Sequence, residues 1–128
     1  MHYDSQLVFV YGTLRRGGAN HRLLAGSRML EYMETDDIYT MYDLGDYPAI
    51  VQNGKCSIVG ETYAISTEIL AMLDELEECP DYYQRILINT SYGKAWIYVL
   101  AKIPDGSICV IESGDWLLHT TGRGHHLR

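Results

Sequence analysis

Short apolar runs separated by turn residues make up most of this sequence, and their alternation of apolar and polar positions is typical of β-strands. The runs predict strands at residues 7–11, 28–33, 38–44, 49–51, 57–65, 85–90, 95–101 and 107–111. The strand expected at 95–101 is apolar on both faces, which indicates burial on both sides. Because strands outnumber helices, we expect an α+β fold, a small mixed β-barrel flanked by short helices.

Local turn chemistry divides these strands. Asn53-Gly54 is typical of a two-residue hairpin turn, so we expect the chain to reverse there. A second hairpin is expected around Tyr92-Gly93, and a short helical turn at residues 21–24.

One long helix is expected at residues 67–78. Ser66 is a favourable N-cap, and Cys79-Pro80 ends the helical pattern. The apolar residues at 69, 70, 72, 73 and 76 form one arc of the helix, and Glu77 falls inside it. An ionised carboxylate buried without a partner costs several kcal/mol, so Glu77 must be paired, protonated or used in chemistry.

Two effects act on Glu77 in the same direction. Loss of solvent and the negative end of the helix dipole both disfavour its anion, so its pKa should be raised, which suits general acid/base catalysis. The alternative is structural: a salt bridge to Arg15, Arg16 or Arg85, or a frayed helix end that exposes the carboxylate.

The first predicted strand stops at Gly12 and leads into a loop with two arginines and two glycines. A strand that stops at a glycine leaves backbone N–H groups unpaired, and such groups suit a carboxylate or a developing oxyanion. The loop therefore reads as an anion cradle, although a flexible turn with two solvated arginines has the same pattern.

Composition limits the remaining possibilities. A chain of 128 residues, 47% hydrophobic, fits one domain, residues 1–128, with a flexible tail from about residue 118. The net charge of −7 argues against nucleic-acid binding. No apolar run approaches about 18 residues and no signal peptide begins the chain, so we expect no membrane partner.

Cys56, Cys79 and Cys109 form no CxxC pair, which favours reduced thiols and the cytoplasm. The histidines lack metal-ligand spacing, so no metal site is expected.

Several motifs occur in a fixed order across nearly the whole chain. They are Phe-Val-Tyr-Gly-Thr-Leu-Arg-Arg-Gly at 9–17, Gly-Glu-Thr-Tyr at 60–63, Leu-Asp-Glu-Leu-Glu at 73–77, Cys-Pro at 79–80, Tyr-Gln-Arg at 83–85 and Gly-Asp-Trp at 114–116. With them the sequence resembles the gamma-glutamylcyclotransferase-like family, and within it the gamma-glutamylamine cyclotransferase/YtfP-type branch. The resemblance implies a pocket between the first loop and the acidic end of the helix.

The resemblance also implies roles for particular residues. Glu77 would be the catalytic acid/base, and the loop residues Tyr11, Gly12, Thr13 and Leu14 would hold the gamma-glutamyl or 5-oxoproline moiety. Charge from Arg15 and a pocket wall from Tyr83 are further expectations; the alternatives are a surface arginine and a core tyrosine.

The implied reaction releases 5-oxoproline and a free amine from a small gamma-glutamyl substrate, and needs no cofactor or metal. Two other functions fit the same pocket: a non-catalytic domain that binds a small acidic metabolite, and an enzyme that forms or cleaves an amide without ring closure. The chain would be a monomer or a homodimer. After Trp116 it lacks the tyrosine that closes the pocket in some family members, which leaves closure and substrate choice open.

Overall fold

The computed structural model describes residues 6–106 and 108–126. Its larger sheet has the strand order β2-β5-β1-β7-β6, in which β1 and β7 are parallel and the other neighbours antiparallel. These strands are β1 (Gln6–Val10), β2 (Arg28–Glu34), β5 (Val59–Ile65), β6 (Tyr83–Thr90) and β7 (Gly93–Leu100).

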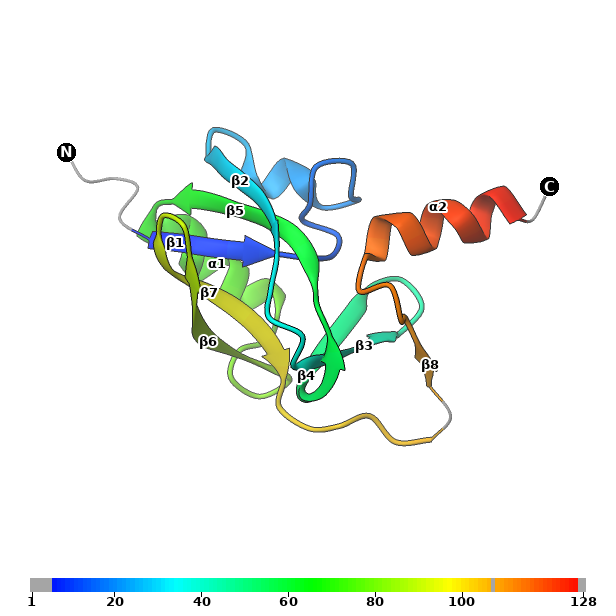
Figure 1. Ribbon diagram of the computed structural model, residues 1–128. Helices are drawn as coiled ribbons and strands as arrows, with labels where there is room; N and C mark the ends of the chain where they lie inside the picture. The colour runs from blue at the N-terminus through cyan, green and yellow to red at the C-terminus, as the bar shows by residue number, and fades with distance from the viewer. Residues whose placement is uncertain (1–5, 107, 127–128) are drawn as a thin grey trace.

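A second, antiparallel sheet has the order β4-β3-β8 and comprises β3 (Tyr39–Asp43), β4 (Pro48–Cys56) and β8 (Cys109–Val110). The helices are the short 3-10 turn η1 (His21–Leu24), α1 (Thr67–Leu76) and α2 (Trp116–His126) (Figure 1). The α+β class is confirmed. The predicted closure of the strands into a barrel is wrong: the described strands form two sheets, and β2 and β6 are the edge strands of the larger one.

The core lies on both faces of the larger sheet, because successive side chains of a strand point to opposite faces. In β1, Val8 packs into the cluster that contains Leu70 and Leu73 of α1, while Phe9 packs into the cluster that contains Met41 of β3 and Ile50 of β4. β7 alternates between the same two clusters, so its predicted burial on both faces is confirmed. The end of β1 therefore lies between α1 and the smaller sheet.

The helix before the site begins where the sequence predicts. The Ser66 hydroxyl accepts a hydrogen bond from the Ile69 amide at 3.1 Å, which caps α1. The buried stripe is narrower than expected, since Met72 and Leu76 are exposed. α1 ends at Leu76, and Glu77 is its C-cap.

The turn predicted at Asn53-Gly54 is wrong, because β4 continues through both residues. A Cβ on Gly54 would lie within 2.3 Å of the Tyr39 carbonyl oxygen, and the Asn53 carbonyl accepts a hydrogen bond from the Thr40 hydroxyl. The pairing of β3 with β4 shifts register at this point. The glycine therefore permits a close approach of two strands and not a chain reversal.

The C-terminal strand is shorter than expected. The strand expected at 107–111 contains only β8, and Ser107 lies outside the described residues. From Trp116 to His126 the chain forms α2. Its start is fixed by buried Trp116 and by Asp115, whose carboxylate accepts a hydrogen bond from the Leu118 amide. His119 lies 2.8 Å from a carboxylate oxygen of Asp43.

Candidate active site

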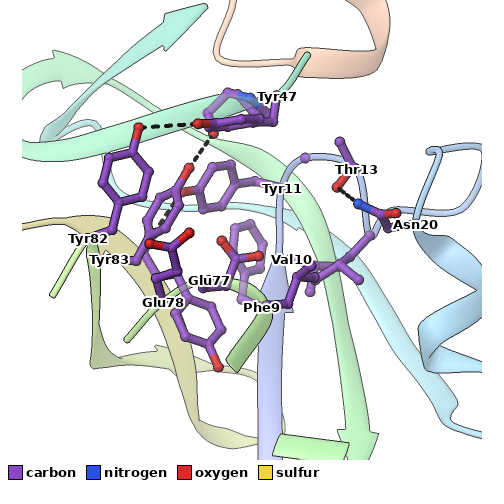
Figure 2. A pocket seen from close by; sticks show the side chains of 15 residues that line it. Phe9, Val10, Tyr11, Thr13, Asn20, Tyr47, Glu77, Glu78, Tyr82 and Tyr83 are labelled. Carbon is purple, nitrogen blue, oxygen red and sulfur yellow. Dashed lines mark hydrogen bonds between the residues drawn. The ribbon is translucent and has the colours of Figure 1, made fainter. Parts of the chain in front are cut away.

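A cavity of about 210 Å³ opens between the loop after β1, the end of α1 and the start of β4. Figure 2 shows the 15 residues that line it. The structure brings together six of the seven site residues predicted from the sequence: Tyr11, Gly12, Thr13, Leu14, Glu77 and Tyr83. The seventh, Arg15, does not line the cavity.

Glu77 is one of two carboxylates that line this cavity. Its side chain is half-buried, and its backbone N–H donates to the Leu73 carbonyl at 2.9 Å, which fixes the helix end. Among the described residues, no side chain forms an ion pair or a hydrogen bond with its carboxylate. Arg85, one candidate partner, instead binds Asp74 through two hydrogen bonds of 2.8 and 3.1 Å. Burial raises the pKa of Glu77 to about 7, so the group is poised near neutral pH.

The loop after β1 is held in one conformation by short contacts. A Cβ on Gly12 would lie 2.8 Å from Pro48 at the start of β4, so only glycine fits without displacement. The Arg15 amide donates to the Gly12 carbonyl at 3.1 Å, and both the hydroxyl and the carbonyl of Thr13 accept hydrogen bonds from Asn20. In the described part of the chain, the amides of Gly12, Thr13 and Leu14 donate to no protein acceptor, which leaves three N–H groups beside the cavity.

Arg15 lies in a buried ion-pair network. Only 5% of its surface is exposed, and its guanidinium binds Glu61 at 3.2 Å and Asp115 at 2.8 Å. The other carboxylate oxygen of Glu61 accepts hydrogen bonds from the Arg16 amide and the Tyr63 hydroxyl. This buried network fastens the loop to β5 and to the start of α2. Arg15 therefore lies outside the cavity lining with its charge paired to two carboxylates, and its expected contact with a substrate stays a prediction.

Tyrosines form much of the cavity wall. The Tyr11 hydroxyl donates to the Tyr98 carbonyl at 2.7 Å, and the Tyr83 hydroxyl donates to the Pro48 carbonyl at 2.9 Å. Burial raises the pKa of both hydroxyls, and the nearby Glu77 charge acts in the same direction. Both phenols are therefore neutral at physiological pH. Because their protons are engaged, they serve as walls of the cavity.

Sequence analysis missed several lining residues: Asn20, Tyr47, Glu78, Tyr82 and Tyr98. Tyr47 and Tyr82 come from different segments, and their hydroxyl oxygens lie 3.3 Å apart at the rim. Only the adjacency of Glu78 to Glu77 and of Tyr82 to Tyr83 could have drawn attention to them.

In the described ranges, no three His, Cys, Asp or Glu side chains gather closely enough to hold a metal ion. Over the same ranges, every helix is too short or too polar to span a bilayer.

Known proteins place this arrangement in a family. Residues 8–118 match the family model described as gamma-glutamyl cyclotransferase, AIG2-like. The chain belongs to this family. The match includes both the loop after β1 and the end of α1, so the two halves of the cavity lie inside the family region.

Relatives from bacteria and animals agree with this assignment. A putative gamma-glutamylcyclotransferase of Vibrio cholerae is 46% identical over 86% of this chain and 94% of its own length. Gamma-glutamylaminecyclotransferase B of Danio rerio is 33% identical over 75% of this chain and 60% of its own length. The solution structure of YtfP from Escherichia coli is 39% identical, covers 90% of this chain and 99% of its own, and superposes with a TM-score of 0.72. The predicted family and its YtfP-type branch are confirmed.

Proposed function

We propose that this protein is a gamma-glutamyl cyclotransferase that releases 5-oxoproline and a free amine from a gamma-glutamyl amine or a small gamma-glutamyl conjugate. The observation that carries the proposal is the unpaired, half-buried Glu77 carboxylate, which shares one cavity with the free amides of the loop after β1. The family of the chain and the name of its zebrafish relative point to the same chemistry.

Glu77 acts as the proton carrier in the proposed reaction. Its carboxylate accepts a proton from the substrate's α-ammonium group, and the free α-amine attacks the γ-carbonyl carbon of the same molecule. A carbon–nitrogen bond forms and closes the ring, and the bond from that carbon to the leaving nitrogen breaks. The leaving nitrogen takes the proton from Glu77, which regenerates the carboxylate. The second proton, which the ring nitrogen loses as it becomes a lactam N–H, passes through the same carboxylate to the released amine, which departs as an ammonium ion. A pKa of about 7 suits both steps near neutral pH.

The loop after β1 holds the substrate in the folded conformer that this attack needs. The amides of Gly12, Thr13 and Leu14 are suited to bind the α-carboxylate or the oxyanion that develops on the γ-carbonyl. Because nucleophile and electrophile belong to one molecule, orientation alone can contribute roughly 7 to 11 kcal/mol in favourable systems. The tyrosines around the cavity limit the number of other conformers.

Turnover of a substrate panel tests the proposal directly. Purified protein and the Glu77→Gln variant are incubated with gamma-glutamyl amines, gamma-glutamyl dipeptides and glutathione, and 5-oxoproline is followed by mass spectrometry. We expect 5-oxoproline from the wild type and a loss of 100-fold or more in the variant, within the range for general acid/base groups. In the wild type, kcat/KM rises with pH through about 7, and this limb is absent in the variant.

Two outcomes would replace the proposal. Free glutamate in place of 5-oxoproline would indicate hydrolysis without ring closure. If neither protein releases 5-oxoproline and small carboxylates raise the Tm, the result would indicate a binding domain. We place the protein in the cytoplasm, where its three free cysteines would stay reduced, as a monomer or a homodimer.

A further inference from the structure

The rim of the cavity is acidic and aromatic. Within the described part of the chain, the lining residues include two glutamates, Glu77 and Glu78, and no lysine, arginine or histidine. Tyr47 and Tyr82 are 38% and 39% exposed, whereas Tyr11 is 7% exposed, so the cavity runs from a closed end at Tyr11 to an open rim at the other two tyrosines. A substrate whose gamma-glutamyl part lies beside Glu77 would extend its leaving group toward this rim.

Glu78 lies at a position where a glutamate is locally unfavourable for two reasons. It follows Glu77, the C-cap of α1, and lies at the end of the helix where the negative end of the helix dipole disfavours a carboxylate. Its φ of 53° lies in the left-handed region, where glycine or asparagine is the usual residue after a helix. Residues that contradict two local preferences are candidates for a functional role.

The groups at the rim are close enough to act together. The hydrogen bond with Tyr47 raises the pKa of the Tyr82 hydroxyl to about 12, and the charge of Glu78 adds to this effect. Figure 2 shows Tyr47 and Tyr82 joined above Tyr83, with Glu78 on the same side of the cavity. A carboxylate beside two phenol rings is suited to an organic cation, which gains both charge attraction and cation–π contact.

We propose that the preferred leaving group is a cationic amine, such as a diamine or a polyamine, and that Glu78, Tyr47 and Tyr82 determine this preference. The inference rests on the proposed function. A leaving group that ends in a carboxylate, as in a gamma-glutamyl amino acid, would meet the like charge of Glu78 and find no basic side chain on the lining. At an exposed rim, the difference between attraction and repulsion corresponds to roughly a tenfold effect.

Three substrates of matched length test the preference. They are the gamma-glutamyl amides of 1,4-diaminobutane, pentylamine and 4-aminobutanoate, whose far ends are cationic, neutral and anionic. We expect wild-type kcat/KM to fall in that order at low ionic strength, by about tenfold from the first to the last, mainly through KM. At 0.5 M salt the differences should shrink.

Two variants identify the group responsible. Glu78→Gln should reduce the tenfold ratio to about threefold or less. Glu75→Gln, the matched control, removes a charge from an exposed position of α1 that does not line the cavity, and should leave the ratio unchanged. An equal or higher kcat/KM for the anionic substrate, or an unchanged ratio in Glu78→Gln, would overturn the inference.

The same compounds separate this inference from the proposed function. If none of the three releases 5-oxoproline, the proposed function fails for these substrates, and calorimetry then measures their dissociation constants. The charge preference would still be supported if the wild type binds the cationic compound most tightly and Glu78→Gln abolishes this difference in affinity. Dissociation constants that do not depend on the charge of the leaving group, or no binding at all, would refute the charge preference.

Discussion

The Glu77→Gln substitution should stabilise the protein above neutral pH, because the wild type holds this carboxylate in a poorly solvated place. Folding raises the pKa of Glu77 from its ordinary value of 4.5 to about 7. Between these pH values the unfolded chain has lost the proton and the folded protein keeps it, so the free energy of unfolding falls as pH rises. Above about pH 7 both states are ionised, and the loss of stability stays constant.

The size of the effect follows from the same two values. They differ by about 2.5 pH units, and each unit corresponds to about 1.4 kcal/mol, which sets an upper limit of about 3 kcal/mol. Because the side chain keeps some contact with water, we expect about 2 kcal/mol. Glutamine has the same shape and no charge, so the variant should gain this amount at pH 8, with a Tm roughly 5–10 °C higher. The difference should decline as the pH is lowered toward 4.5.

Urea unfolding from pH 5 to pH 8.5, followed by tryptophan fluorescence, measures the effect. The decisive quantity is the change with pH in the stability difference between variant and wild type, because any pH-independent effect of glutamine cancels. Glu75→Gln is the control, and an exposed substitution of this kind should change the unfolding free energy by less than about 0.5 kcal/mol. A difference for Glu77→Gln that does not vary with pH, or that favours the wild type more at pH 8, would refute the reasoning.

Three other substitutions test the framework of the site. Gly12→Ala brings a Cβ to within 2.8 Å of Pro48 and should lower kcat/KM about tenfold or more, with a stability loss of about 1–3 kcal/mol; unchanged kinetics would show that the loop can move. Tyr83→Phe removes the 2.9 Å hydrogen bond to the Pro48 carbonyl and should cost about 1 kcal/mol in urea unfolding, and a neutral result would mean that the bond has no net value. Glu61→Gln leaves Arg15 buried with one carboxylate and should cost about 2–4 kcal/mol by thermal denaturation; a loss below about 1 kcal/mol would contradict the buried network.

The helix that carries Glu77 was predictable because its information is local. The cap, the apolar stripe and the stop at Cys79-Pro80 all lie within about fifteen residues, and Ser66 does bond the amide of the third residue after it. The position of Glu77 beside Leu73 follows from the helical period alone. The hairpin of β6 and β7 was predictable for the same reason.

The turn expected at Asn53-Gly54, where β4 continues instead, shows where prediction from local sequence fails. The same dipeptide that favours a reversal also permits close contact between backbones, and the sequence does not distinguish these uses. The choice is made by Tyr39 and Thr40 of a neighbouring strand, which pack against Gly54. The prediction of a barrel failed for a similar reason, because closure depends on whether edge strands that are distant in the sequence pair with each other.

The unpaired state of Glu77 depends on residues far from it. Arg15 and Arg85 were both possible partners, and either would have lowered the pKa of Glu77 by stabilising its anion. Instead, Arg85 binds Asp74. Arg15 binds Glu61 and Asp115, which follow it in the sequence by 46 and 100 residues. The sequence indicates a carboxylate that must be paired, protonated or used, but only the tertiary structure shows which arginines are already occupied. By binding these cations elsewhere, the fold keeps the Glu77 carboxylate unpaired, as the proposed proton transfer requires.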